Sequence, residues 1–180
     1  MRCSWVNLNN KLYVDYHDKE WGKIITDDNK LFEMLILEIF QTGLSWEIIL
    51  NKRDNFRKAF DNFNYYKISK YDKNKVNELL NNKGIIRNKN KILATINNAK
   101  IFIEIRKEYK TFYDYIWHFA NYKVIYGDGT NNSNDLSDII SIDLKKRKMK
   151  FVGTKVIYAY LQALGVIYDH MKCCEMYKNS

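Results

Sequence analysis

The segment "LFEMLILEIFQTGLSW", residues 31–46, constrains the fold most, because its apolar residues recur with the spacing of a buried helix. On a helix that turns by about 100° per residue, Glu38 points the same way as Leu31 and Leu35. Glu33 is expected to point away from that apolar face. A carboxylate that is buried without a partner is destabilising or shifts its pKa. Glu38 is therefore either a structural acid that an arginine or a backbone amide satisfies, or a site acid that receives a ligand.

Helical periodicity continues along the chain and predicts an all-α fold. The expected helices cover residues 28–42, 46–58, 73–82, 88–108, 111–120 and 154–164. Gly43, Gly84 and Gly165 each follow one of these segments, as a left-handed residue at a helix end would. The sequence "YKVIYG" at 122–127 is the one strand candidate, and the polar loop "DGTNNSND" at 128–135 follows it.

Composition limits the classes of protein to which this chain can belong. The 180 residues contain no proline and no linker-like stretch, which predicts one folding unit over residues 1–180. No apolar run approaches the ~20 residues of a membrane span, and no apolar signal segment follows Met1. We therefore expect a cytoplasmic monomer without membrane contact. A net charge of +9 favours a polyanionic partner such as nucleic acid, although a compositional bias towards lysine would give the same charge.

Two basic stretches are candidates for contact with nucleic acid. In "NNKGIIRNKNK" a glycine turn and two isoleucines precede a basic helix start, which resembles a helix-hairpin-helix. Such a turn can direct backbone N–H groups at a phosphate while Arg87, Lys89 and Lys91 supply charge. The stretch "LKKRKMKFVGTK" at 144–155, which contains Lys150, is the second candidate. An ordinary helix end and a solvated lysine face remain the alternatives for both.

Large aromatic residues gather near the N-terminus. Three of the four tryptophans lie in the first 46 residues of the chain with two tyrosines: Trp5, Tyr13, Tyr16, Trp21 and Trp46. An aromatic face stacks on a nucleobase with ~1–3 kcal/mol, so these residues could form a slot for a flat base. Each of them could equally pack in the core.

Cysteine and histidine residues near the two chain ends form a candidate metal site. Two thiolates and two imidazoles from Cys3, His17, His170 and Cys174 would complete a tetrahedral set for Zn²⁺. The i, i+4 spacing of His170 and Cys174 places them on one face of a helical turn. Such a site would tie the N-terminus to the C-terminus and close a very long loop. Cys173 is an almost equivalent neighbour, and the spacing matches no standard zinc finger.

These motifs together resemble one family of repair enzymes. The chain carries, in order, "RCSWV", "LYVDYHDKEWG", "LFEMLILEIFQTGLSW", "GIIRNKNKI", "KFVGTKVIYAYLQALG" and "DHMKCC". Their order and spacing resemble those of the bacterial 3-methyladenine DNA glycosylase I family, from Cys3 to Cys174. The resemblance implies a helix-hairpin-helix glycosylase fold whose termini are joined by structural zinc. It also implies hydrolytic, monofunctional excision of N3-methylated adenine from double-stranded alkylated DNA in base excision repair, with free 3-methyladenine as the product.

The resemblance also implies roles for individual residues. Glu38 would be the catalytic carboxylate that accepts the N–H edge of the base, and Trp46 would stack on the base. The remaining pocket wall would come from Trp5, Tyr13, Tyr16 and Trp21. DNA contacts would come from a wedge at Gly43 and Leu44 and from Gly84, Ile85, Ile86, Arg87, Lys89 and Lys150. The metal ligands would be Cys3, His17, His170 and Cys174.

The chain departs from the family at two positions and leaves one alternative function open. Ile39 and Phe40 stand where the family has a small residue and a glutamine, next to the wedge turn, so the DNA-facing surface is expected to differ there. The alternative function is a non-catalytic helical module, stabilised by zinc, that senses damaged or single-stranded DNA. Release of free base from methylated DNA distinguishes an enzyme from such a binder.

Overall fold

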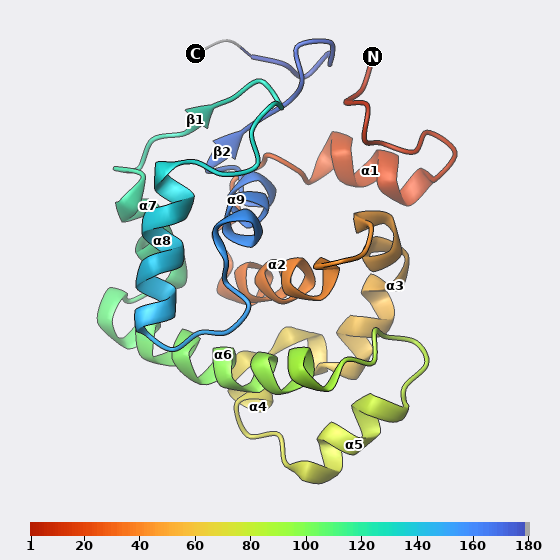
Figure 1. Cartoon of the computed structure of the whole chain (residues 1–180), viewed down its shortest axis with the longest axis vertical. Coiled ribbons are helices and arrows are strands. Elements are labelled where there is room, and N and C mark those ends of the chain that lie inside the picture. The colour runs from red at the N-terminus through yellow and green to blue at the C-terminus, as the bar shows by residue number, and fades with distance from the viewer. Residues whose placement is uncertain (179–180) are drawn as a thin grey trace.

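The computed structural model describes residues 1–178 as a mostly helical protein with one two-stranded sheet (Figure 1). In chain order its elements are α1 (Lys11–Lys19), α2 (Asp28–Gln41), α3 (Trp46–Ala59), the 3₁₀ turn η1 (Asp61–Phe63), α4 (Tyr65–Ile68), α5 (Lys73–Asn81), α6 (Lys89–Tyr109), α7 (Phe112–Phe119), β1 (Ile125–Tyr126), α8 (Asp135–Lys146), α9 (Thr154–Ala163) and β2 (Ile167–Tyr168). Each helix expected from the sequence is present, and each of its ends lies within one residue of the expected end.

Three helices and one strand were not predicted from the sequence. The helix α8 begins with a capping box formed by Asn134 and Ser137, but it exposes Ile139 and Ile142, so its apolar residues do not follow one face. The helices α1 and α4 are short, and polar residues dominate α1. The strand β2 forms because it pairs in parallel with β1, a contact between distant segments that no local pattern reveals.

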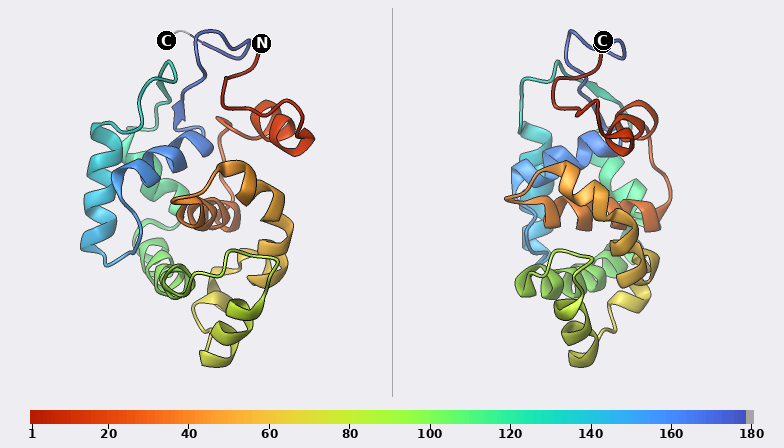
Figure 2. Two further views of the ribbon diagram at one scale, coloured as in Figure 1. Left: turned by 45° about the vertical axis from the view of Figure 1, so that its right-hand side comes forward. Right: turned by 90° about the vertical axis from the view of Figure 1, so that its right-hand side faces the viewer.

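The helix α2 crosses the middle of the molecule, and α3, α6, α7 and α9 pack around it (Figures 1 and 2). Every residue of α2 from 31 to 40 is buried. Ile39 and Phe40 are fully buried, and the Phe40 ring packs edge-on against Phe56. These two departures from the family therefore pack in the core and do not themselves form the DNA-facing surface. Their effect on the adjoining turn stays a prediction.

Glu33 does not point into solvent as expected, because α2 is covered on all sides. Its side chain is buried, and its Oε1 accepts from Arg53 Nε at 2.6 Å and lies 2.8 Å from Arg57 Nη2. Arg53 also pairs with Glu20 at 2.7 Å, which links α3 to the end of α1. Glu33 is thus a buried acid with structural partners, because buried charges are stable when they are paired.

Two of the three helix-ending glycines have the expected left-handed backbone. Gly43 has φ +84° and Gly165 has φ +74°, and a Cβ at Gly165 would lie 2.6 Å from the carbonyl carbon of Lys23. Gly84 was predicted to be left-handed, but it is not among the glycines with positive φ. There the side chain of Asn82 accepts the Gly84 N–H at 2.8 Å and forms the turn instead.

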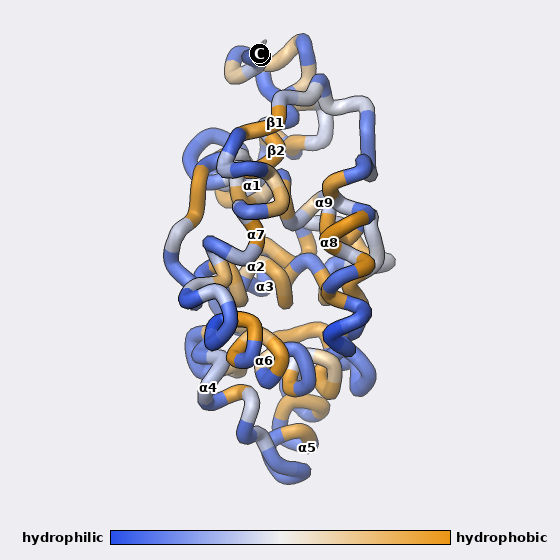
Figure 3. The backbone as a smooth tube through the Cα atoms, turned by 90° about the vertical axis from the view of Figure 1, so that its left-hand side faces the viewer, coloured by the Kyte–Doolittle hydropathy of each residue, from blue (hydrophilic) through white to orange (hydrophobic). Residues whose placement is uncertain are grey.

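The two ends of the described chain lie side by side at one end of the molecule (Figure 2). The N-terminal amine pairs with Glu175, and the Met1 carbonyl accepts the Glu175 N–H at 2.8 Å. Hydrophilic segments occur at both ends of the molecule and in the outer loops (Figure 3). Within residues 1–178 no helix combines the length and apolar character needed to cross a membrane.

Candidate active site and metal cluster

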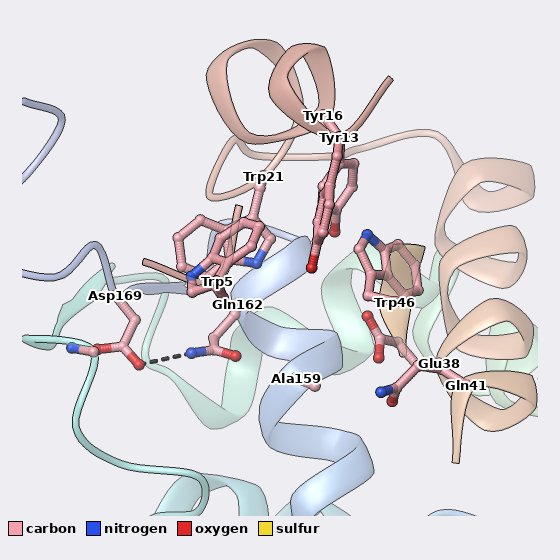
Figure 4. A pocket seen from close by; sticks show the side chains of 11 residues that line it. Trp5, Tyr13, Tyr16, Trp21, Glu38, Gln41, Trp46, Ala159, Gln162 and Asp169 are labelled. Atoms are coloured by element: carbon pink, nitrogen blue, oxygen red, sulfur yellow. Dashed lines mark hydrogen bonds between the residues drawn. The ribbon is translucent and has the colours of Figure 1, made fainter. Parts of the chain in front are cut away.

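The helix α2 ends at a pocket that α1, α3 and α9 complete (Figure 4). The cavity measures about 220 Å³, which is smaller than the roughly 300–1,000 Å³ of sites for drug-sized ligands. Its lining residues are Trp5, Tyr13, Tyr16, Trp21, Glu38, Gln41, Trp46, Gly129, Ala159, Gln162 and Asp169. The structure therefore brings together Glu38 and all five aromatic residues that the sequence nominated for the pocket.

Local sequence explains how α1 presents its two tyrosines. Asn10 caps the helix by accepting two backbone N–H groups, and its amide donates to Glu47 at 2.8 Å, which ties α1 to α3. Tyr13 and Tyr16 are three residues apart, so they share one face of the helix and both descend into the pocket (Figure 4). The Tyr16 ring lies 5.2 Å from the Trp46 ring, at a tilt of 45°.

The remaining aromatic residues form the other wall. The centroid of Trp5 lies 5.4 Å from that of Tyr13 and 5.0 Å from that of Trp21, with the two indoles edge to face. Ser45 caps α3 and places Trp46 at its first position, beside Glu38. An aromatic slot with a carboxylate at one end is the result.

Glu38 is buried without a partner, in contrast to Glu33 on the same helix. Its side chain is 5% exposed, and no hydrogen bond or ion pair among residues 1–178 satisfies its carboxylate. Burial alone raises the pKa of Glu38 to about 8. If Glu38 were a structural acid, an arginine or a backbone amide would have to pair with it. In the structure Glu33, not Glu38, is the acid that pairs with arginine side chains.

A second polar group in the pocket is also unsatisfied. The Trp46 indole Nε1–H is buried and has no acceptor in the described chain. Buried polar groups normally find hydrogen-bond partners, so each exception calls for an explanation. The unpaired Glu38 carboxylate beside the Trp46 ring is the pattern of a site that receives a polar, planar ligand.

Sequence reasoning did not identify the residues of the far wall. Asp169 is buried, and its carboxylate accepts from Tyr158 Oη at 2.9 Å, from Gln162 Nε2 at 2.7 Å and from the Gly129 N–H at 2.8 Å. These bonds fasten the loop after β1 to α9 beside the pocket (Figure 4). The residues that these bonds join are up to 40 positions apart in the sequence, so no local motif predicts the bonds.

The four nominated metal ligands converge. The ligand atoms of Cys3, His17, His170 and Cys174 all lie within 4.8 Å of one another, and all four residues are buried. His170 Nδ1 lies 3.6 Å from Cys3 Sγ and 3.5 Å from Cys174 Sγ, and His17 Nε2 lies 3.6 Å from Cys174 Sγ. Cys173, the alternative ligand, is exposed. This cluster can bind a metal ion.

Two residues that the sequence analysis overlooked support the cluster. His17 Nδ1 lies 2.8 Å from Asp18 Oδ1, which leaves Nε2 to face the sulfur atoms. Arg2 in turn donates to both carboxylate oxygens of Asp18 at 2.7–3.0 Å. Such a carboxylate–histidine contact commonly orients a metal ligand.

The residues nominated for DNA contact differ in exposure. Gly43 is exposed and Leu44 is half-buried in the turn between α2 and α3. In the loop between α5 and α6, Ile85 is buried, Gly84 and Ile86 are half-buried, and Arg87 is exposed, as is Lys89 at the start of α6.

Lys150 is exposed in the loop before α9, and Asn98 of α6 holds that loop through the Lys150 backbone at 2.8 and 2.9 Å. Lys91 was expected to offer charge to a phosphate, but it is buried, and its ammonium donates to backbone carbonyls at the end of α2. Lys91 therefore belongs to the interior of the protein.

Comparison with known proteins agrees with this geometry. The family model described as "Methyladenine glycosylase" matches residues 5–178. DNA-3-methyladenine glycosylase 1 of Escherichia coli strain K12 is 40% identical over 98% of this chain and 96% of its own length. A crystal structure of a 3-methyladenine DNA glycosylase I superposes with a TM-score of 0.94 at 39% identity, covering 99% of this chain and 100% of the other. The Staphylococcus aureus enzyme superposes with a TM-score of 0.92 at 27% identity, covering 99% of this chain and 97% of its own. This chain belongs to the methyladenine glycosylase family.

Proposed function

We propose that this protein is a monofunctional DNA glycosylase that excises N3-methylated adenine from double-stranded alkylated DNA, the first step of base excision repair. The observation that carries the proposal is the buried, unpaired carboxylate of Glu38 at the end of an aromatic slot. Such a slot is complementary to a flat base that carries positive charge and N–H donors.

The chemistry of the lesion explains why a carboxylate and indoles suit it. Methylation at N3 leaves adenine with a delocalised positive charge, and a cation over an aromatic face gains ~0.5–2 kcal/mol. Arrival of that cation gives Glu38 the charge-assisted partner that it lacks and lowers its pKa again. A neutral adenine offers neither gain, so the pocket favours the damaged base.

The proposed reaction makes modest demands on the protein. The bond between C1′ of the sugar and N9 breaks, and its electron pair leaves with the base, which departs as a neutral molecule. Water then adds to C1′ and releases a proton. The Glu38 carboxylate stabilises the positive charge that develops on the sugar. No lysine lines the pocket of the described chain, so a Schiff-base lyase step is not expected.

Access to the base requires that it leave the duplex. We propose that Gly43 and Leu44 act as a wedge at the damaged base pair while the α5–α6 loop grips the phosphate backbone as a helix-hairpin-helix. Arg87 in that loop, Lys89 at the start of α6 and Lys150 before α9 are exposed cations suited to phosphate contacts. Flipping of the target base into an active-site pocket is the general solution for enzymes that act on bases.

We further propose that the metal cluster holds one structural Zn²⁺. Zinc bonds of about 2.3 Å to sulfur and about 2.0–2.1 Å to nitrogen, at tetrahedral angles, separate S and N ligands by about 3.6 Å. Three of the four S···N pairs lie 3.5–3.6 Å apart and fit that geometry, and all four ligand atoms lie within 4.8 Å of one another. The ion would fix the N-terminal segment that carries Trp5 against the C-terminal segment.

Chromatography of the bases released from methylated duplex DNA tests the proposed function. We expect release of 3-methyladenine by the wild-type protein and much less by Glu38→Gln. A non-catalytic damage sensor would retard the DNA on a gel and release no base, which would refute the enzymatic proposal. The same chromatogram shows whether 3-methylguanine is released as well.

A further inference from the structure

Lys91 is an unusual lysine because it is buried at the junction of two functional elements. Its side chain is 6% exposed, and desolvation lowers its pKa. Its backbone lies in the first turn of α6, directly after the α5–α6 loop, where its N–H donates to the capping residue Asn88 at 3.1 Å. Its ammonium reaches across to the end of α2 and donates to the carbonyls of Phe40 at 2.9 Å and Thr42 at 2.8 Å.

These carbonyls lack helical partners because α2 ends here. The Leu44 N–H, which would reach the Phe40 carbonyl in a continuing helix, donates to the Gln41 carbonyl at 2.7 Å instead. The last carbonyls of a helix also carry its negative dipole end, which favours a cation. Lys91 therefore satisfies both groups with a charged donor.

The turn at 42–45 is held on its other side as well. The side chain of Gln41, which lines the pocket, donates to the Leu44 carbonyl at 2.8 Å. Lys91 thus connects the beginning of the 42–45 turn to α6. Gln41 connects the Leu44 end of the same turn to the pocket. The tip of the turn, Gly43, is exposed.

We propose that Lys91 is a positioning residue that fixes the 42–45 turn relative to the α5–α6 loop. When that loop binds the phosphate backbone, the fixed turn is placed opposite the damaged base pair, where it acts as the wedge. This inference rests on the proposed function, since it takes the turn as the wedge and the loop as the grip. In this proposal Lys91, although part of a basic segment, positions the turn and does not contact DNA itself.

The test measures binding to two duplexes of the same sequence by fluorescence anisotropy, one undamaged and one with a single tetrahydrofuran abasic site. A wedge can enter the gap of the second duplex only. We expect Lys91→Met to lose about tenfold in affinity for the abasic duplex and little for the undamaged one, with an unchanged salt slope. Lys89→Met is the matched control, because it removes an exposed charge two residues away. It should weaken binding to both duplexes alike and reduce the salt slope by about 0.9.

Two further measurements separate positioning from loss of the fold. Lys91→Met should still bind free 3-methyladenine, and Lys91→Gln, which keeps a neutral donor, should show an intermediate loss of preference for the abasic duplex. Both variants are compared below their melting temperatures. If Lys91→Met weakens both duplexes equally, as the control does, or keeps the wild-type preference, the inference is overturned. A wild-type protein that has no preference for the abasic duplex and releases no base would instead refute the proposed function.

Discussion

Replacement of Glu38 by glutamine should make the protein more stable at alkaline pH. The buried carboxyl has a pKa of about 8, against 4.5 for the ordinary group, because burial disfavours its charged form. Between these two pH values the folded state keeps a proton that the unfolded state has released. Stability therefore falls as the pH rises through this window, and glutamine, which does not titrate, removes the loss.

The size of the effect follows from the difference between the two pKa values. That difference corresponds to about 5 kcal/mol once the pH is well above 8, and to about 3–4 kcal/mol between pH 5 and pH 8. This is a large fraction of the roughly 5–15 kcal/mol by which proteins are stable. Denaturant unfolding of both proteins at pH 5, 6, 7 and 8 measures it, because all other titrating groups are common to the two chains.

The outcome distinguishes a ligand-receiving acid from a structural one. We expect the free energy of unfolding of Glu38→Gln to rise relative to wild type as the pH increases. Parallel pH profiles would show that Glu38 is not held neutral by burial. A Glu38→Gln protein that is less stable than wild type at pH 8 would show that a buried partner needs the negative charge.

Three further predictions concern the metal, the stack and the DNA surface. Cys174→Ser should lose bound zinc in native mass spectrometry and melt at a lower temperature, whereas exposed Cys173→Ser should keep both properties. If Cys173→Ser loses zinc and stability while Cys174→Ser keeps both, Cys173 is the metal ligand instead of Cys174. Trp46→Ala should weaken 3-methyladenine binding by ~1–3 kcal/mol in a calorimetric titration, through lost stacking. Arg87→Ala and Lys150→Ala should each lower the salt slope of DNA binding by about 0.9 for all sequences, and unchanged slopes would place the phosphate contacts elsewhere.

Local pattern predicted the helices that bury one clear face or are buried throughout. Residues 28–42 were recognised as a helix because their apolar spacing is strong, and α2 follows it almost to the residue. The helix α8 was missed because Ile139 and Ile142 are exposed on its outer side. The position of Glu33 was predicted wrongly because helical phase does not reveal that a helix is surrounded on every side.

The candidate site was predictable where chemistry-bearing residue types stand in motifs. The pocket aromatics, Glu38 and the four metal ligands were all nominated from the sequence and all converge. Lys91 and Asp169 could not be assigned, since their partners include backbone groups 40 or more residues away in the chain. The basic motif at 81–91 predicts positive charge, but it does not show that Lys91 is buried while Lys89 is exposed, because this depends on the tertiary fold.

Calorimetric titration of 3-methyladenine into the wild-type protein and Glu38→Gln tests the central claim most directly. If the unpaired carboxylate exists to receive the methylated base, the substitution weakens binding by ~1.5–3 kcal/mol, the value of a lost charged hydrogen bond, while the protein stays folded. A folded Glu38→Gln protein that binds 3-methyladenine as tightly as wild type would contradict the assignment of Glu38 to base recognition.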